Sequence, residues 1–600
     1  MHKRMTLAGC VALAAAVPGW AARPVEVTRS ADGSVRVAAK AYAAAIDRDG
    51  HFTSLSFGGA EFLGAAAKKG GLFPGGPAEK VEVQGTTVTA ARGDVRVEYR
   101  FDDAGFELST RGGTVEWWLS PAVNACVARD GQVAVTSEAM GDVQKVVAGK
   151  AALGLGKPYH IMHGRLWPSH LCGRGGKPED PFTSRFECGV PFEPADLLSM
   201  VSLEAEGFKL PATPAFTAGQ APRVKLSLRN LGGTEAKGDV RFRVLDHPVK
   251  PRTVLEKTLP AAVPAGQALS LPLDVPLQAP GLYWVHADMS RDGKPFKQSQ
   301  LGLLYDPGRY RPPLTRPPDF REFWDRKLRE MRAVPFDAKL TEAPAGGNER
   351  FAHHDLEIAG IGGKRLRTFL RVPRKPGPHD AEVISHWGSD TPGKVMAHLQ
   401  GLEKQPAGAG MWQRGADRIR VGAPQPEDST YTRWAGADDN NMLESYLLNV
   451  RMADYLRSRP DVGKLWMFGG SRSGASILAA AALSPERVAA VNAHVPTCCG
   501  LSWADRPYSG WGRPPAATPE GLRTAAYFDV TNFAPDLAVP CIVDGGFYDG
   551  LSPAPGILAF HNWAEKAPFK RCSLELGGHG FFPPGNRQRA EKELEEFMGR

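Results

Sequence analysis

The sequence predicts a multidomain protein, with all-β regions first and a C-terminal α/β domain built on a doubly wound, mostly parallel sheet. Three observations support this fold class. The chain has 600 residues, which is too long for a single hydrophobic core. Up to about residue 306 it consists of short segments in which apolar and polar residues alternate, with turn residues between them. From about residue 319 helical and strand patterns alternate, which is typical of a parallel sheet covered by helices.

The first folded region is expected to be a β-sandwich over residues 22–203. The stretch AAIDRDGHFTSLSFGG contains a strand, an Asp-Gly turn and a second strand. It resembles the opening of galactose-mutarotase-like β-sandwiches, and the region carries no identifiable active site.

The second region, residues 204–306, is expected to be an immunoglobulin-like β domain. Val224, Leu226 and Leu228 alternate with polar residues, and the stretch DVRFRVLD repeats this pattern. Period-two alternation over roughly a hundred residues without a helix indicates such a sandwich. A carbohydrate-binding role and a spacer role are both open for this domain.

A proline-rich linker over residues 307–318 then leads to a catalytic domain over residues 319–600. The linker is stiff because proline restricts its backbone. A helix is expected at DFREFWDRKLREMRAV, strands at KRLRTFLRVP and AEVISHW, and an amphipathic helix at LESYLLNVRMADYLRSRP. The stretches CIVDGG and CSLEL are expected to be later strands of the same sheet.

The N-terminus has the pattern of a secretory signal peptide over residues 1–21. Basic residues precede an apolar stretch from Met5 to Val17, and small residues follow up to Ala21. The stretch is too short to span a bilayer well, so no membrane span is expected. We therefore expect a secreted or periplasmic protein, and a lipoprotein anchored at Cys10 is the less favoured alternative.

The charge of the chain argues against nucleic acid and membrane surfaces as partners. The net charge of +8 is spread over 600 residues, and no long run of lysine and arginine occurs. Hydrophobic residues make up 42% and charged residues 23%, as in ordinary globular proteins.

The stretch WMFGGSRSGASILAAAAL predicts a nucleophile elbow with Ser471 at its tip. A short apolar run predicts a buried strand, and the alanine-rich segment predicts a helix. The glycines between them allow a turn that is too sharp for larger residues. The match to G-x-S-x-G is imperfect, because Ser473 stands where the second glycine is expected. An ordinary Gly-Ser loop is the alternative for this stretch alone.

Two later residues complete the pattern of an α/β-hydrolase active site. A nucleophilic serine needs a base, and the base needs a carboxylate that orients it. Asp549 follows the predicted strand CIVDGG, and His579 follows the predicted strand CSLEL. The order serine, aspartate, histidine at successive strand ends is that of α/β-hydrolases. The sequence therefore predicts a catalytic triad of Ser471, Asp549 and His579.

Residues from about 310 to 600 resemble the acetyl xylan esterase and cephalosporin C deacetylase family. The lead-in PPDFREFWDRKLREMRAVPFDAKL, the elbow and the segment AAYFDVTNFAPDLAVPCIVDGGFYDGLSPA are similar to that family, and GGHGF stands where it has Gly-His-Glu. The resemblance implies an α/β-hydrolase fold in which Ser471 is the nucleophile, Asp549 the orienting carboxylate and His579 the base.

Two departures from the family pattern concern the oxyanion hole. Arg472 replaces the glutamine that follows the nucleophile, but its backbone N–H can still donate to an oxyanion. The second donor is expected from SHWGSD, where Gly388 takes the place of the family's tyrosine.

These observations predict a secreted serine esterase that removes O-acetyl groups from carbohydrates through an acetyl-enzyme. The substrate is a small-molecule or oligosaccharide ester, and neither a metal nor an organic cofactor is expected. Tryptophans of the catalytic half are candidates for stacking on sugar rings, with core packing as the alternative for each. They are Trp387, Trp412, Trp434, Trp503 and Trp511.

Other functions remain open at this point. The Ser-Arg pair at the elbow is also similar to glucuronoyl esterases, which need a cationic acyl site that Arg414, Arg418 and Arg420 could supply. Another carboxylesterase acting on plant or algal polysaccharide is a related alternative. A non-catalytic carbohydrate-binding protein with a relic hydrolase domain is the alternative from a different class.

Overall fold

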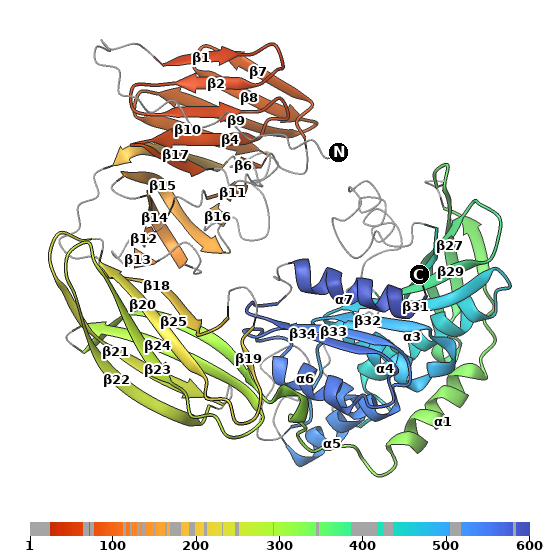
Figure 1. Cartoon of the computed structure of the whole chain (residues 1–600). Coiled ribbons are helices and arrows are strands. Elements are labelled where there is room, and N and C mark those ends of the chain that lie inside the picture. The colour runs from red at the N-terminus through yellow and green to blue at the C-terminus, as the bar shows by residue number, and fades with distance from the viewer. Residues whose placement is uncertain are drawn as a thin grey trace, which may run out of the picture.

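Three successive groups of strands make up the protein in a computed structural model (Figure 1). The structure describes residues 25–63, 71–72, 77–111, 116–119, 123, 125–128, 133–134, 140–148, 151–162, 165–168, 182–190, 198–208, 213–230, 232–246, 251–291, 293–343, 347–385, 417–423, 436–503, 518–579 and 584–599. The predicted signal peptide lies outside these ranges. Within them, no helix has the length and apolar character that a membrane crossing requires.

The first group is a network of antiparallel strands. They are β1 (Glu26–Arg29), β2 (Val35–Ala38), β3 (Ala43–Ile46), β4 (Phe52–Phe57), β5 (Ala60–Leu63), β6 (Gly71–Leu72), β7 (Lys80–Gln84), β8 (Thr87–Arg92), β9 (Val95–Asp102), β10 (Gly105–Arg111), β11 (Glu116–Trp118), β12 (Ala125–Ala128), β13 (Val133–Ala134), β14 (Met140–Ala148), β15 (Ala151–Met162), β16 (Arg165–Pro168) and β17 (Phe182–Val190). Aromatic rings fill its core, where Phe106 stacks on Phe52 at 5.1 Å and on Phe186 at 4.6 Å between ring centroids. The prediction that this region consists mostly of strands is confirmed for its described residues, and its mutarotase-like classification stays a prediction.

The second group is a sandwich of two sheets that share one core. One sheet contains β18 (Leu198–Ala205), β20 (Arg223–Asn230) and β23 (Ala268–Asp274); the other contains β19 (Ala215–Phe216), β21 (Ala236–Leu245), β22 (Thr253–Val263), β24 (Gly281–Arg291) and β25 (Lys294–Tyr305). Val224, Leu226 and Leu228 all point into the core, as the alternation predicts. The domain boundary expected at residue 203 falls inside β18. Because β18 pairs with β20, its residues belong to this second group.

The proline-rich segment 307–318 packs along the domain that follows it. Asn562 donates to the carbonyl oxygens of Pro307 and Tyr310, at 2.7 and 2.8 Å. The indole of Trp563 donates to the carbonyl oxygen of Pro312 at 3.0 Å. The segment is therefore fixed to the third group as well as stiffened by its prolines.

The third group is a nine-stranded sheet with the order β26-β27-β28-β30-β29-β31-β32-β33-β34. Its strands are β26 (Lys339–Glu342), β27 (Phe351–Ala359), β28 (Arg365–Pro373), β29 (His379–Ser385), β30 (Ile419–Ala423), β31 (Val462–Gly470), β32 (Ala490–His494), β33 (Cys541–Gly546) and β34 (Lys570–Glu575). The pairings from β30 through β34 are parallel, whereas β26, β27 and β28 pair antiparallel. The carboxyl ends of β31, β32, β33 and β34 therefore meet along one edge.

Helices cover this sheet. They are α1 (Phe320–Arg332), α3 (Asn441–Arg457), α4 (Arg472–Leu483), α5 (Pro519–Phe528), α6 (Ala554–Trp563) and α7 (Pro584–Phe597), with short helices η1 (Pro307–Arg309), η2 (Ile361–Gly363), η4 (Pro485–Arg487) and η5 (Val530–Asp536). The apolar residues of α3, α4 and α6 share one core with Met467 and Val491 of the sheet. Those of α7 pack with Trp466, Ala490 and Ile542, which alternate with that set along their strands. The helices therefore cover both faces.

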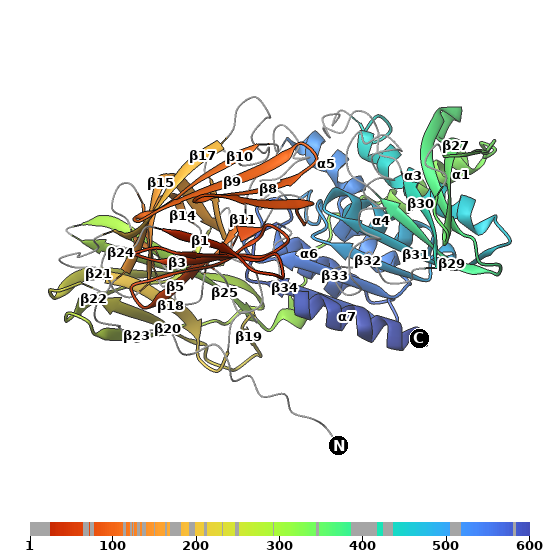
Figure 2. The same ribbon diagram turned by 90° about the horizontal axis from the view of Figure 1, so that it is seen from above.

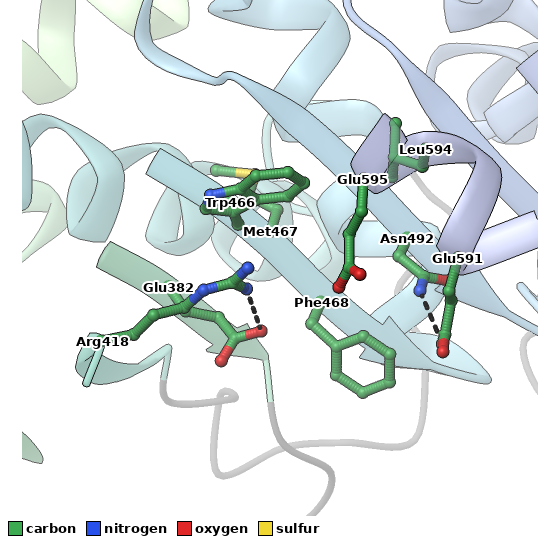
Figure 3. Close-up of a pocket in the computed structure, with 9 residues that line it drawn as sticks. All are labelled: Glu382, Arg418, Trp466, Met467, Phe468, Asn492, Glu591, Leu594 and Glu595. Carbon is green, nitrogen blue, oxygen red and sulfur yellow. Dashed lines mark hydrogen bonds and ion pairs between the residues drawn. The ribbon is translucent and has the colours of Figure 1, made fainter. Parts of the chain in front are cut away.

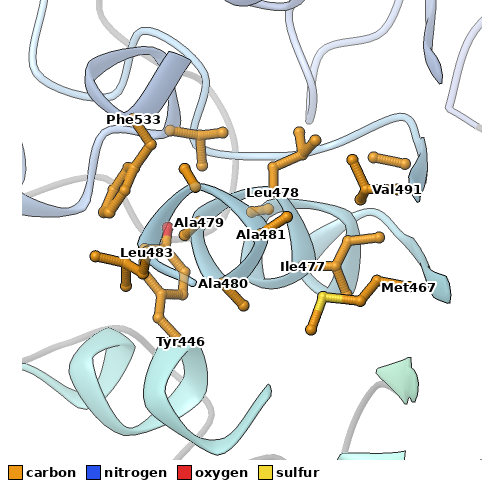
Figure 4. Packing of buried hydrophobic residues seen from close by; sticks show 14 of the residues in the cluster. Tyr446, Met467, Ile477, Leu478, Ala479, Ala480, Ala481, Leu483, Val491 and Phe533 are labelled. Atoms are coloured by element: carbon orange, nitrogen blue, oxygen red, sulfur yellow. The ribbon is translucent and has the colours of Figure 1, made fainter. Parts of the chain in front are cut away.

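Helix α4 is buried along its whole length (Figure 4). Its run of alanines keeps the helix thin, so that α3, η5 and the sheet approach it closely. Helix α3 differs from the amphipathic prediction, because it is buried nearly all round. Even Arg451 lies inside, where its guanidinium donates to the backbone carbonyls of Ala359, Val334 and Pro335. Because charged residues such as Arg451 predict an exposed face, the sequence pattern did not predict that this helix is buried.

Gly556→Ala is expected to destabilise the third group strongly. A Cβ atom on Gly556 of α6 lies 2.5 Å from the carbonyl carbon of Cys499, which is backbone and unable to turn aside. Overpacking of this kind costs about 1–3 kcal/mol or more. Thermal unfolding measures the loss, and Gly308→Ala, whose Cβ meets nothing within 4 Å, is the control. Equal stability of both variants would contradict this packing.

Candidate active site

Ser471 occupies a strained turn between β31 and α4. Its backbone has φ 56° and ψ −123°, a combination that residues other than glycine rarely adopt. The Ser471 N–H donates to the carbonyl oxygen of His494 at 2.7 Å. The Ser471 carbonyl accepts from the N–H groups of Ala475 and Thr497, both at 3.1 Å. Backbone bonds on both sides therefore hold the strained conformation.

Two glycines allow the close crossing of strand and helix at this turn. A Cβ atom on Gly469 would lie 2.7 Å from the carbonyl carbon of Ser473, and one on Gly474 would lie 3.2 Å from the carbonyl oxygen of His494. Ser473, which stands in place of the second motif glycine, is itself buried in α4. The close approach therefore requires glycine at 469, and the Ser473 side chain is accommodated.

The structure brings the three predicted triad residues together. His579 Nε2 lies 3.1 Å from Ser471 Oγ, and His579 Nδ1 lies 2.8 Å from Asp549 Oδ2. The Asp549 side chain is fully buried, and its other oxygen accepts from the N–H groups of Leu551 and Ser552 at 2.7 and 2.9 Å. Such an arrangement can accept a proton from a serine hydroxyl and stabilise the resulting imidazolium.

A second histidine–aspartate pair, which sequence analysis did not identify, lies beside the elbow. His494 Nδ1 is 2.6 Å from Asp544 Oδ1, and the same oxygen accepts from the Val495 N–H at 3.0 Å. These bonds fix the end of β32, whose His494 carbonyl accepts the Ser471 N–H. Parallel pairing of His494 with Asp544 brings them together. His494 is the last residue of β32, whereas Asp544 lies within the predicted strand CIVDGG.

Arg472, the first residue of α4, has its amide at the positive end of the helix dipole. The residue is 3% exposed, and its guanidinium donates to Ser445 Oγ of α3 at 3.2 Å. Gly388, the second expected oxyanion donor, lies outside the described residues.

The predicted sugar-stacking tryptophans are mostly outside the described ranges, which exclude Trp387, Trp412, Trp434 and Trp511. Trp503 is described and is 8% exposed within the hydrophobic core. A ring so deeply buried has no face for a sugar, so its burial favours the core-packing alternative.

The described arginines of the glucuronoyl-esterase alternative are arranged around an internal carboxylate. Arg420 Nε lies 2.8 Å and Arg418 Nη1 3.7 Å from Glu382. Glu382 is level with Trp466, which precedes Ser471 by five residues, or about 16 Å of strand. Arg414 lies outside the described residues.

Arg418 also lines a pocket between the sheet and α7 (Figure 3). Its guanidinium lies over the ring of Trp466, 4.6 Å from the centroid. Asn492 and Glu591 close another side through a hydrogen bond of 3.2 Å. Neither Ser471, Asp549 nor His579 lines this pocket, so it is separate from the candidate site.

Comparison with known proteins finds relatives of the C-terminal part of the chain. Residues 302–572 match the sequence model of the family described as acetyl xylan esterase (AXE1). The chain is 26% identical over 291 residues to the acetyl esterase Axe7A of Xylanibacter ruminicola, a match that covers 44% of this chain and 64% of that relative.

Similar solved structures include acetyl xylan esterase 1 from Thermoanaerobacterium sp. JW/SL YS485, with 20% identity and a TM-score of 0.40. That match covers 48% of this chain and 96% of the other. Acetyl xylan esterase from Paenibacillus sp. R4 has 18% identity and a TM-score of 0.40, over 48% of this chain and 98% of the other. The sequence matches confirm the resemblance drawn from the motifs: residues 302–572 are similar to the acetyl xylan esterase family.

Proposed function

We propose that this protein is a serine esterase that removes O-acetyl groups from carbohydrates. The observation that carries the proposal is the position of His579, whose ring nitrogens lie within hydrogen-bond distance of Ser471 Oγ and Asp549 Oδ2. The match of residues 302–572 to the acetyl xylan esterase family model supports acetyl as the acyl group. The signal-peptide pattern of residues 1–21 supports an exported protein.

In the proposed mechanism Ser471 attacks the acetyl carbonyl while His579 takes its proton. Asp549 holds the imidazole in the productive orientation and stabilises its positive charge. The backbone N–H of Arg472 donates to the oxyanion, together with the expected N–H of Gly388. His579 then protonates the departing sugar hydroxyl, and water hydrolyses the acetyl-enzyme by the same route.

The position of Arg472 favours deacetylation over the glucuronoyl-esterase alternative. A uronate-binding arginine needs an accessible guanidinium, whereas that of Arg472 is buried and donates to Ser445 on α3. Arg418 and Arg420 share Glu382 within the sheet, about 16 Å along the strands from the nucleophile.

Ser471→Ala is expected to abolish hydrolysis of p-nitrophenyl acetate, because loss of a triad nucleophile lowers kcat by on the order of 10⁶-fold. Ser473→Ala is the matched control, since it removes a nearby hydroxyl that is buried in α4. The measurement is the hydrolysis rate of each purified variant, with circular dichroism to verify folding. An active Ser471→Ala beside an inactive Ser473→Ala would show that the elbow is misassigned.

Asp549→Asn is expected to lower kcat by about 10³–10⁴, because the imidazole loses its orienting acceptor and adopts the wrong tautomer. The buried amide retains the size of the carboxylate, so the fold should persist. Asp544→Asn is the comparison, since Asp544 binds the ring of His494. Near-normal turnover in Asp549→Asn together with a large loss of turnover in Asp544→Asn would assign the orienting role to Asp544 instead of Asp549.

Activity is expected to fall steeply from acetyl to butyryl and longer esters. In a pocket with room to spare, each further methylene would add about 0.8 kcal/mol of binding free energy. A pocket shaped for one methyl has no room for it, so a longer acyl chain loses binding free energy through overpacking. The measurement compares p-nitrophenyl esters of rising chain length with benzyl glucuronate. Cleavage of the glucuronate faster than the acetate would reject deacetylation in favour of the alternative.

A further inference from the structure

The β18–β25 sandwich touches the residues that immediately precede Asp549. In two views its strands β19 and β25 lie beside the β34 edge of the nine-stranded sheet (Figures 1 and 2). The indole N–H of Trp284, on β24, donates to the carbonyl oxygen of Phe547 at 3.3 Å. The rings of Trp284 and Phe547 lie 4.9 Å apart between centroids. An aromatic contact and a hydrogen bond thus join the sandwich to the start of the acid loop, residues 546–549.

The next residue, Tyr548, is bound to β25 through its phenol. The Tyr548 hydroxyl accepts from the Gly302 N–H at 3.0 Å and donates to the Gln300 carbonyl oxygen at 3.3 Å. Desolvation raises the pKa of this phenol, so the hydroxyl keeps the proton that it donates. A Cβ atom on Gly302 would lie 2.6 Å from Cγ and Cε1 of Phe547, so the ring occupies the space of a missing side chain.

The opposite side of the acid loop is bound to the segment that carries His579. The Phe547 N–H donates to the Glu575 carbonyl oxygen at 2.7 Å, and the Tyr548 N–H donates to that of Gly577 at 2.9 Å. The sandwich also reaches this segment directly, since Thr213 Oγ1 donates to the Leu574 carbonyl oxygen. Leu576 packs against the cores of both domains. The acid loop is therefore held between the segment that carries His579 and the sandwich.

We propose that the β18–β25 sandwich holds the acid and base of the active site in position relative to Ser471, with Tyr548 as the positioning residue. This inference rests on the roles proposed for Asp549 and His579. A displacement of about 1 Å within a catalytic arrangement costs on the order of 10²-fold in rate, so a bond that restrains the acid loop has a kinetic effect. The sandwich is then a structural part of the catalytic unit.

The test compares Tyr548→Phe with Tyr283→Phe in the full-length protein. Each variant removes one phenol hydroxyl and keeps the ring, but the Tyr283 hydroxyl donates to Ala279 within the sandwich, at 2.6 Å. Three quantities are measured: kcat and KM for p-nitrophenyl acetate, the rate at which a fluorophosphonate labels Ser471, and the unfolding temperature. The labelling rate reports the reactivity of Ser471 without depending on the natural substrate.

Tyr548→Phe is expected to lower kcat and the labelling rate together by about fivefold to tenfold, with KM within about twofold of the wild type. Gly302→Ala, which pushes on the Phe547 ring, should lower both further, whereas Tyr283→Phe should leave both unchanged. Normal kcat and labelling in both Tyr548→Phe and Gly302→Ala would overturn the inference, as would an equal loss in Tyr283→Phe.

The proposed function fails separately. A wild type whose Ser471 is labelled but which leaves acetate esters intact rejects deacetylation, and the labelling rates of the variants still test the inference. A wild type in which Ser471 is not labelled rejects both proposals.

Discussion

The positive φ of Ser471 is the constraint on which the arrangement of the C-terminal domain depends. A serine at φ 56° costs on the order of 1–3 kcal/mol, and it persists because the surrounding backbone leaves it no alternative. The N–H and carbonyl of Ser471 are both bonded to the segment that leaves β32, at His494 and Thr497. The position of Ser471 therefore depends on the position of that segment.

Buried carboxylates fix this segment and its neighbours. Asp544 binds the His494 ring and the Val495 N–H, and Asp549 binds the His579 ring and two backbone N–H groups. Asp529 accepts from the N–H groups of Gly500, Ser502 and Thr531 at 2.9 to 3.0 Å. Burial removes each carboxylate from water, and hydrogen bonds from loop N–H groups replace those to water. Because these bonds require the N–H groups in fixed positions, each carboxylate specifies one loop conformation. Irregular backbone at the carboxyl edge of the sheet is made rigid in this way.

The proximity of Ser471, Asp549 and His579 was predictable from sequence because each of these residues follows its own short apolar strand. Ser471, Asp549 and His579 come after β31, β33 and β34, and parallel strands bring their carboxyl ends to one edge. Local pattern and chain order suffice for that conclusion. The same reasoning recovered the inward residues of β20 and the helix α1.

Features that depend on strand pairing across the sheet could not be predicted from the sequence pattern. The pairing of His494 with Asp544 requires β32 to lie between β31 and β33, and no local signal states that order. The burial of Arg451 depends on three carbonyls from distant segments, so periodicity placed α3 on the surface. The boundary predicted at residue 203 falls inside β18, and the pairing of β18 with β20 is likewise not visible in the local sequence.

The position of β34 explains why the β18–β25 sandwich contacts the segments that carry Asp549 and His579. β34 is the terminal strand of the nine-stranded sheet, so among the described residues one side of it has no neighbouring strand to hold it. The loop that carries His579 continues from this edge, and edge strands open more readily than central ones. Thr213 and Leu576 tie that edge to the sandwich, and Trp284 ties the adjacent acid loop to it. Ser471 follows a central strand and is held by bonds within the sheet domain itself, whereas the segments of Asp549 and His579, near the edge of the sheet, also receive contacts from outside it.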